Sequence, residues 1–417
     1  MTKIGKYFLL LHNYMYLCMS EVINIKRHLL LFLFIAFAFN ALNGQETYRF
    51  RTDAPQGLNI ESSTAAGLTL HYSLAEIGIA DIDNGEAKGQ EIILKGSFGS
   101  FAEGQPNLPS ENHYIAVPQG ATVRVAVKEN GSNTLHGIDL LPAATVIGNT
   151  TVGLPKLHKD MSIFDKDANF PSENVLIAQT TQIRGLDVVL LSVTPFRYNP
   201  VKKTLEVIYD MDIEVCFEGG NGRFGDERYR NPDWDGILRN LVINNDMLPE
   251  AHYYERLNEA IQNREEGCEY LIIAPDNESI LAWADTLKDF RTKQGILTKV
   301  VSTAECGGNN AVTIKNYIKN AYENWAIPPA TVMIFGEYMD TMYYYQEQFF
   351  FSTGVSGIPG FPLIFLNYND SGEDYAYYSD NPYADMNDDS IPDIALSRLP
   401  ALTAEEYQNQ VVISINL

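Results

Sequence analysis

The sequence is poor in cysteine, with four in 417 residues, which excludes a dense disulfide scaffold. Cys18 lies in an N-terminal segment that we expect to be removed. Cys268 precedes one predicted strand and Cys306 follows the next. In parallel neighbours this would place them at opposite edges of a sheet, about 17 Å apart for five residues. A disulfide needs Cα atoms within about 7 Å, so we predict no bridge between Cys268 and Cys306. Nothing in the sequence marks any of the three remaining thiols as a nucleophile, so we also predict no reactive thiol.

Histidine is missing from the last part of the chain: the last one is His252, and none lies between Cys268 and Leu417. A Cys–His or Ser–His centre needs an imidazole to accept the proton of the nucleophile. The zinc-binding helix motif of metalloproteases and a glycine-rich phosphate loop are also absent. The residues after Cys268 therefore contain no complete hydrolytic centre of these kinds.

Basic residues are scarce in the same region. The net charge is −23, and from Asp340 onward twelve acidic residues face a single basic one, Arg398. The negative electrostatic potential of such a region repels nucleic acid and anionic lipid and attracts cations, so we expect no nucleic-acid partner. Solubility alone is the simpler explanation of the overall charge.

No apolar run reaches the roughly 20 residues that a membrane-spanning helix needs. A basic segment, residues 26–28, precedes an eleven-residue apolar run, Leu29 to Phe39, and small or polar residues follow up to Gly44. This order predicts a signal peptide over residues 1–44, cleaved after Gly44.

We expect residues 1–18 to be superfluous, with translation starting at Met19. The mature protein is then secreted through the periplasm to the exterior or the cell surface, with no membrane span after signal cleavage. An uncleaved anchor is the alternative.

Residues 45–220 predict a β-rich domain, sandwich-like or barrel-like. Short stretches rich in β-branched residues are bounded by Gly, Pro and Asn, and no helical period persists. These stretches are residues 91–95, 113–117, 122–128, 188–193 and 204–209. Residues 221–267 are polar and arginine-rich, which predicts a linker or activation segment open to proteolysis, or else a solvated helix around 251–264.

The hydrophobic period changes at Cys268. Apolar strands are predicted at 270–274, 298–302 and 331–335, separated by two amphipathic helices that begin near Ile280 and Ile314. This alternation predicts an α/β domain over 268–417 with a doubly wound, mostly parallel sheet. Ligands of such sheets bind at the carboxyl ends of the strands, so function is expected next to Gly336 and Glu337. The aromatic triplets 343–345 and 349–351 follow in a long, glycine-punctuated loop, where they would line a groove or be partly buried.

The acidic run before Pro400 has the spacing of a cation-binding loop. Asp385, Asn387, Asp389 and Asp393 occupy positions 1, 3, 5 and 9, and hard oxygen ligands at such density favour structural calcium over magnesium. Position 6, where glycine usually makes the bend, is Ser390. A solvated acidic loop that closes a strand is the alternative.

The segment after this loop predicts a strand at 393–398 and a helix with a capping box at 403–406. We expect Arg398 to pair with a nearby carboxylate. The tail 411–417 departs from the expected helix pattern, as a frameshift or premature stop would make it do.

Several short segments of the sequence occur in the same order as in one known family. In chain order they are residues 104–109, 115–122, 194–200, 234–244, 270–274, 293–295 and 314–325, and the acidic run ending in 397–400. Together they resemble the gingipain-like cysteine peptidases, family C25, of secreted Bacteroidetes proteins. The first three are similar to the propeptide, 234–244 to the stretch before the catalytic domain, and the rest to its caspase-like fold.

The resemblance implies a secreted cysteine endopeptidase that acts on protein or peptide substrates and is made as a zymogen. Its propeptide would cover the substrate groove until cleavage, for which Arg230 and Arg264 are candidate sites. The family places its catalytic His and Cys beyond the Arg-Leu-Pro segment that ends at Pro400, so Cys268 and Cys306 do not match the nucleophile. We therefore assign no catalytic residue, and expect a truncated chain that lacks the dyad and is inactive as written.

Two alternatives stay open: a sortase-like family member of type IX secretion, and a non-enzymatic calcium-binding module that is secreted or lies on the surface. In each case we expect the acidic run to be a scaffold element at the functional edge of the sheet.

Overall fold

The structure is a computed structural model that describes residues 45–416 apart from 53, 84–87, 98, 100–101, 145–156, 338–340, 346–347, 353–357 and 368–373. The predicted signal peptide, residues 1–44, lies outside this range. Among the described residues, no helix is both long and apolar enough to cross a membrane.

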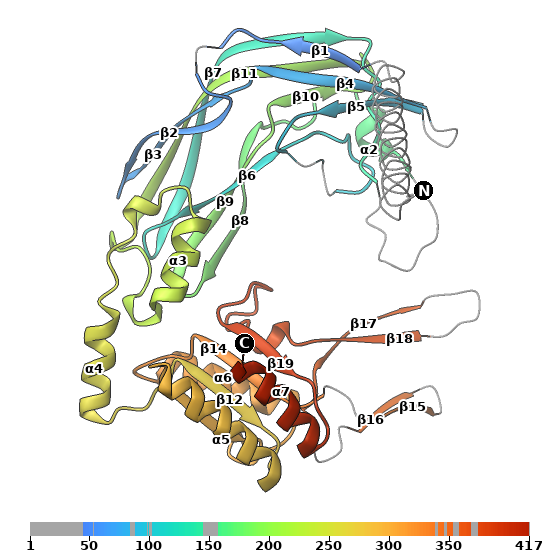
Figure 1. Ribbon diagram of the computed structural model, residues 1–417. Helices are drawn as coiled ribbons and strands as arrows, with labels where there is room; N and C mark the ends of the chain where they lie inside the picture. The colour runs from blue at the N-terminus through green and yellow to red at the C-terminus, as the bar shows by residue number, and fades with distance from the viewer. Residues whose placement is uncertain are drawn as a thin grey trace, which may run out of the picture.

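The N-terminal domain is β-rich, as predicted, and consists of antiparallel sheets that pack around one apolar core (Figure 1). The first sheet has the order β1 (Gln45–Arg49), β4 (Glu76–Asp83), β5 (Lys88–Ile93). The second has the order β10 (Phe196–Asn199), β11 (Thr204–Gly219), β3 (Gly67–Ser73), β2 (Gly57–Thr64), and β7 (Ala121–His136) also pairs with β11. The third has the order β6 (Glu111–Ala116), β9 (Leu186–Val193), β8 (Val175–Ile183); a short helix, α2 (Met161–Phe164), precedes β8.

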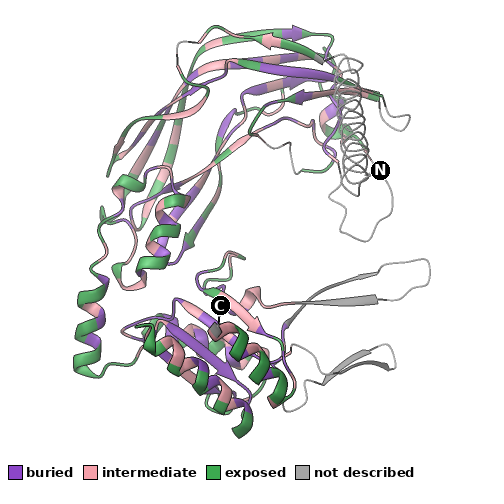
Figure 2. Ribbon diagram, in the orientation of Figure 1, coloured by how far each residue is buried: buried purple, intermediate pink, exposed green. Residues whose placement is uncertain are grey.

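Alternation along the strands explains how these sheets bury one face. On β3, Leu68, Leu70 and Tyr72 are buried, whereas Thr69 and His71 between them are only half-buried. Side chains of successive strand residues point to opposite faces, so this pattern directs the apolar set into the core. Figure 2 shows buried and exposed residues alternating along these strands.

The segment 221–267 is more ordered than a linker. It contains two short 3-10 turns (Glu227–Tyr229 and Asn245–Met247) and two helices, α3 (Pro232–Leu241) and α4 (Tyr253–Asn263). The Asn231 side chain caps the N-terminus of α3, and Trp234, in the first turn of this helix, is buried. The Arg230 side chain is only 3% exposed and pairs with Asp235, so the prediction of a cleavable, exposed Arg230 is wrong. Arg264 is exposed, at the end of α4.

The C-terminal domain has the predicted α/β fold, a fully parallel sheet with helices on both faces (Figure 1). Its order is β13 (Thr298–Ser302), β12 (Tyr270–Ala274), β14 (Thr331–Phe335), β19 (Ala395–Leu399). The first three have the predicted bounds, and β19 starts two residues later than expected. Helices α5 (Glu278–Lys293) and α7 (Ala404–Asn416) cover one face, and α6 (Ala311–Asn324) covers the other.

The central strand β12 shows why both faces must be covered. All five of its residues are buried. Ile272 and Ala274 pack in the cluster with α5 and α7, whereas Leu271 and Ile273 pack in the cluster with α6. A strand that is apolar on both faces is stable only between two layers.

Two predictions about the C-terminal part need correction. The stretch after β14, expected as a loop, forms two hairpins, β15 (Thr341–Tyr345) with β16 (Gln348–Ser352) and β17 (Phe361–Asn367) with β18 (Asp374–Ser379). The side chains of the two aromatic triplets lie outside the described part. The tail continues α7 to Asn416 instead of breaking it, and Val411 is buried against the sheet.

The predicted capping box at the start of α7 is confirmed. The side chains of Thr403 and Glu406 each accept the backbone N–H of the other residue.

We predict that Ile273→Ala lowers the free energy of unfolding of the α/β domain by about 2–5 kcal/mol, because a buried side chain is lost and a cavity remains. The matched control is Ile237→Ala on α3, whose side chain is 50% exposed and which we expect to change stability by about 0.5 kcal/mol or less. Urea denaturation followed by circular dichroism measures both, and equal losses would contradict the assigned core.

Candidate functional site

The carboxyl edge of the sheet is organised by Arg398, the single cation of the acidic region. Its guanidinium donates to both carboxylate oxygens of Asp380, at 2.7 and 2.6 Å, and to the carbonyls of Gly336 (2.7 Å) and Ile358 (2.9 Å). The predicted ion pair is confirmed. It ties β19, the turn after β14 and the start of the acidic run into one unit.

The turn after β14 depends on glycine. Gly336 has φ +125°, a conformation that L side chains rarely adopt, and its N–H donates to Leu399. Glu337 follows, with its N–H bound to Ala401 and its carbonyl bound to Ile358. Glu337 therefore lies at this edge, directly after Gly336, whose carbonyl accepts a hydrogen bond from Arg398.

The thiols of this domain are not built for nucleophilic attack. Cys268 and Cys306 are free and buried. Burial raises the pKa of both thiols, that of Cys306 to about 12, so both are protonated at neutral pH. Neither fits a nucleophile, as predicted from their positions in the sequence.

The acidic loop, residues 385–393, does not lie at the carboxyl edge. Asp393 precedes β19 by two residues, so the loop lies at the amino edge of the sheet. The expectation of a scaffold element at the functional edge is therefore wrong for the loop. It holds for Asp380, at the other end of the run. Tyr383, before the loop, and Met386, within it, are buried against the face covered by α6.

The loop has a tight conformation held by its own carboxylates. Asp385 and Asn387 both accept the N–H of Asp389, and Asp385 also accepts that of Ser390. Ser390 has φ +71°, so it makes the bend for which glycine is usual. Burial raises the pKa of Asp393 to about 6, against the opposing effect of two backbone N–H donors.

Three of the four predicted ligands also contact the β8–β9 hairpin of the β-rich domain. Asp389 accepts a hydrogen bond from the Thr181 hydroxyl. The Asn387 amide donates to the carbonyl of Gln182 (3.0 Å), and Asp393 accepts the N–H of Arg184 (2.7 Å). The loop is therefore part of the contact between the two domains.

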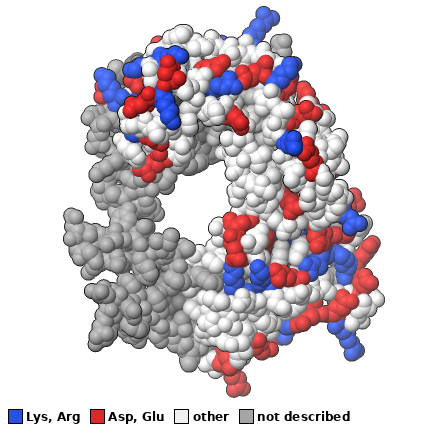
Figure 3. Space-filling model, turned by 180° about the vertical axis from the view of Figure 1, so that it is seen from behind, with Lys and Arg blue, Asp and Glu red and all other residues white. Residues whose placement is uncertain are grey.

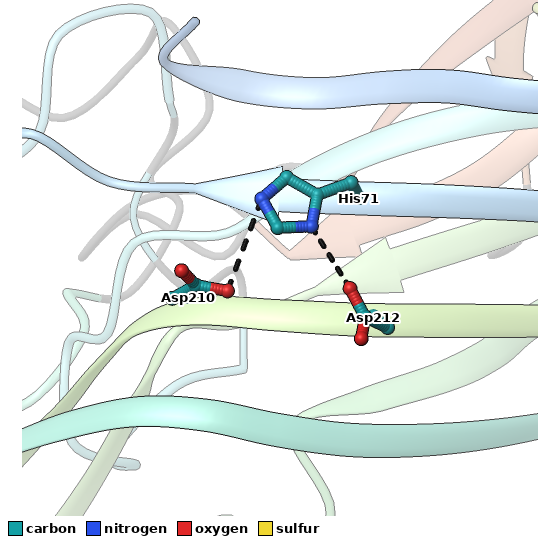
Figure 4. A group of neighbouring side chains, drawn as sticks. All are labelled: His71, Asp210 and Asp212. Carbon is teal, nitrogen blue, oxygen red and sulfur yellow. Dashed lines mark hydrogen bonds and ion pairs between the residues drawn. The ribbon is translucent and has the colours of Figure 1, made fainter. Parts of the chain in front are cut away.

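A separate cluster, His71, Asp210 and Asp212, lies on β3 and β11 of the β-rich domain (Figure 4). Within the described chain it is the one group of three His, Cys, Asp or Glu side chains whose ligand atoms all lie within 4.8 Å of each other; the acidic-loop carboxylates do not meet this limit. His71 Nδ1 is 2.9 Å from Asp212 and Nε2 is 3.8 Å from Asp210. Each nitrogen faces a different carboxylate, and Lys128 pairs with Asp212, so the cluster is a cross-strand network of polar contacts with one lysine ion pair.

Sequence reasoning missed this cluster. Its signal in the sequence is a pair of acidic residues two positions apart on a strand, a spacing that places both side chains on the same face.

Acidic and basic side chains are intermixed over the face of the molecule that Figure 3 shows. The described part of that face carries no broad basic region of the kind that binds nucleic acid.

The two structural domains coincide with two family matches. The family propeptide, Propeptide_C25, matches residues 48–226, and Peptidase family C25 matches residues 263–416. The chain therefore combines a propeptide with a peptidase-type domain. It belongs to peptidase family C25, as a gingipain-like member with its propeptide.

Curated relatives come from Porphyromonas gingivalis. Gingipain R2 is 20% identical over 314 residues, which are 73% of this chain and 40% of that protein. Lys-gingipain is 22% identical over 157 residues, 36% of this chain and 9% of that protein. The chain thus spans less than half the length of these relatives.

Two solved structures are also similar. One, described as bearing on the zymogenic latency of gingipain K, has a TM-score of 0.37 at 21% identity and covers 42% of this chain and 100% of its own. The other, a complex of RgpB pro- and mature domains, has a TM-score of 0.40 at 17% identity, with coverage of 46% and 98%.

We predict that Arg398→Ala destabilises the α/β domain by about 2 kcal/mol, because Asp380 and two carbonyls lose a shared, largely buried donor. Arg398→Lys recovers only part of the loss, since an ammonium lacks the planar fork. The control Lys288→Ala removes an exposed pair with Asp285 and costs about 0.5 kcal/mol or less. Denaturant unfolding measures the three variants, and an Arg398→Ala loss no larger than the control would contradict this role.

Proposed function

We propose that this protein is a secreted cysteine endopeptidase of the gingipain-like class, made as a zymogen and acting on protein or peptide substrates. The observation that carries the proposal is the order of the two family matches, propeptide first and peptidase second, each on its own structural domain. The β-rich domain is then the propeptide, and the parallel sheet is the scaffold of the catalytic domain.

In such an enzyme a thiolate attacks the scissile carbonyl carbon and an imidazole transfers the proton to the leaving amine. Cys268 and Cys306 do not supply this thiolate, because burial keeps them protonated. No histidine follows His252 in the printed sequence. The described α/β residues therefore supply the scaffold of the reaction and not its reacting groups.

We predict that residues 45–417, expressed alone, hydrolyse no fluorogenic peptide, whichever residue precedes the scissile bond. The reason is the lack of an accessible thiol with an imidazole partner. Turnover that disappears in Cys268→Ala or Cys306→Ala, but not in Cys216→Ala, would contradict this assignment.

The gene sequence beyond codon 417 tests the peptidase proposal itself. A coding sequence with His-Gly and a later Cys supports the endopeptidase. A stop codon with no such sequence after it would favour the non-enzymatic calcium-binding module, and a longer N-terminal region encoded upstream would favour the sortase-like member.

We also propose that the acidic loop binds structural calcium. Its ligands would be the side-chain oxygens of Asp385, Asn387, Asp389 and Asp393, a hard donor set that suits this ion. Two observations support it: Asp385 and Asn387 turn toward the same N–H, and Ser390 makes the bend expected of glycine.

We predict that calorimetry detects calcium binding to the wild type and none to Asp389→Ala. The matched control is Asp388→Ala, because the Asp388 side chain is exposed and pairs with Lys315 instead of facing the loop. Identical heats for all three proteins would remove the calcium proposal.

A further inference from the structure

The turn between β8 and β9 inserts an arginine of the β-rich domain into the contact with the α/β domain. Arg184 is 1% exposed, although it is the first residue of a two-residue turn. Its φ is +50° and that of Gly185 is +73°, so both turn residues are left-handed. A β-carbon on Gly185 would clash with the ring of Tyr229, so glycine is required for this close approach.

The Arg184 guanidinium finds its partners at the amino edge of the sheet. It donates to the carbonyls of Pro329 (2.6 Å) and Asp393 (3.2 Å), which precede β14 and β19, and to that of Tyr229 (2.8 Å). Its guanidinium carbon lies over the rings of Trp234 and Tyr322, 5.4 and 5.3 Å from their centroids. Burial lowers its pKa to about 10, so it remains charged at neutral pH.

Contacts around Arg184 extend the same interface. The Trp234 indole N–H donates to the carbonyl of Ala330 (3.0 Å), directly before β14. Tyr229 stacks on Tyr322 of α6 with centroids 4.4 Å apart. The charged group is therefore enclosed by aromatic rings that exclude water, as at the centre of a protein interface.

We infer that the Arg184–Gly185 turn is the anchor that holds the β-rich domain on the amino edge of the sheet, and that docking of this turn competes with a cation for the acidic loop. Competition follows because the hairpin uses the proposed ligand oxygens. The Thr181 hydroxyl and the Arg184 N–H donate to Asp389 and Asp393, and the guanidinium adds a positive charge beside them. A cation that binds those oxygens must displace the donors and accept that charge as a neighbour.

Hydrogen exchange of the whole chain tests the anchor. In Arg184→Ala we expect the undocked population to rise about 30-fold, the effect of losing an interface hot spot, and exchange to accelerate to match in residues 180–188, 327–331 and 385–394. Strands β11 and β12 should keep their protection. Arg124→Ala is the control, because this arginine is 75% exposed and pairs with Glu218 on its own sheet.

Arg184→Lys keeps the charge without the planar fork and should have an intermediate effect; it decides the question if Arg184→Ala fails to fold. Unchanged exchange at the amino edge in a folded variant would overturn the anchor. Equal acceleration throughout both domains would also overturn it, because that result shows general destabilisation instead of undocking.

The competition rests on the calcium proposal above, and a second measurement separates the two. If calcium and the hairpin compete, Arg184→Ala binds calcium more tightly than the wild type, and calcium accelerates exchange of residues 180–188 in the wild type, as linkage requires. Equal calcium affinities would overturn the competition and leave calcium binding intact. No heat in either protein would overturn both, whereas the anchor is still decided by exchange without calcium.

Discussion

The arrangement of the two domains depends on one buried charge, the guanidinium of Arg184. A charged group can be buried only where donors and acceptors satisfy each other. Strands β14 and β19 begin just after the carbonyls of Pro329 and Asp393, and the guanidinium donates to both of them as well as to the carbonyl of Tyr229. Each domain thus satisfies polar groups that the other buries, which explains why a propeptide turn and the base of a peptidase sheet meet at this point.

The Arg184 contact lies at the amino edge of the sheet and not at the carboxyl edge. Five residues of strand place the amino and carboxyl edges about 17 Å apart, so the Arg184 contact does not itself reach the edge where ligands of α/β sheets bind. The acidic run connects them, because Asp380 pairs with Arg398 at the carboxyl edge and Asp393 binds the hairpin at the amino edge. Any influence of this contact on the carboxyl edge must pass through the run or along β14 and β19.

The sequence predicted the α/β domain better than the site. Strand β12 was predictable to the residue, because an apolar run of five between polar turns leaves little choice of register. Helix α3 was missed because only Trp234 and Leu238 of its ten residues are buried, and so few buried positions give a weak helical pattern among charged residues. Arg184 was missed for a stronger reason. An arginine beside glycine in a turn is ordinarily exposed, and only the tertiary contact with Tyr322 and Pro329 buries it.

The acidic loop shows what composition alone leaves out of a proposed cation site. Much of its charge is met by the protein's own donors: Lys315 pairs with Asp388 at 2.5 Å, Lys319 donates to the carbonyl of Met386, and the hairpin donates to Asp389 and Asp393. Asp385 is satisfied by backbone N–H groups of the loop. Of the four predicted ligands, Asp389 and Asp393 use their oxygens to hold the neighbouring domain in the docked arrangement. The proposed ion would therefore have to displace these protein donors, and the loop would then exchange one partner for another.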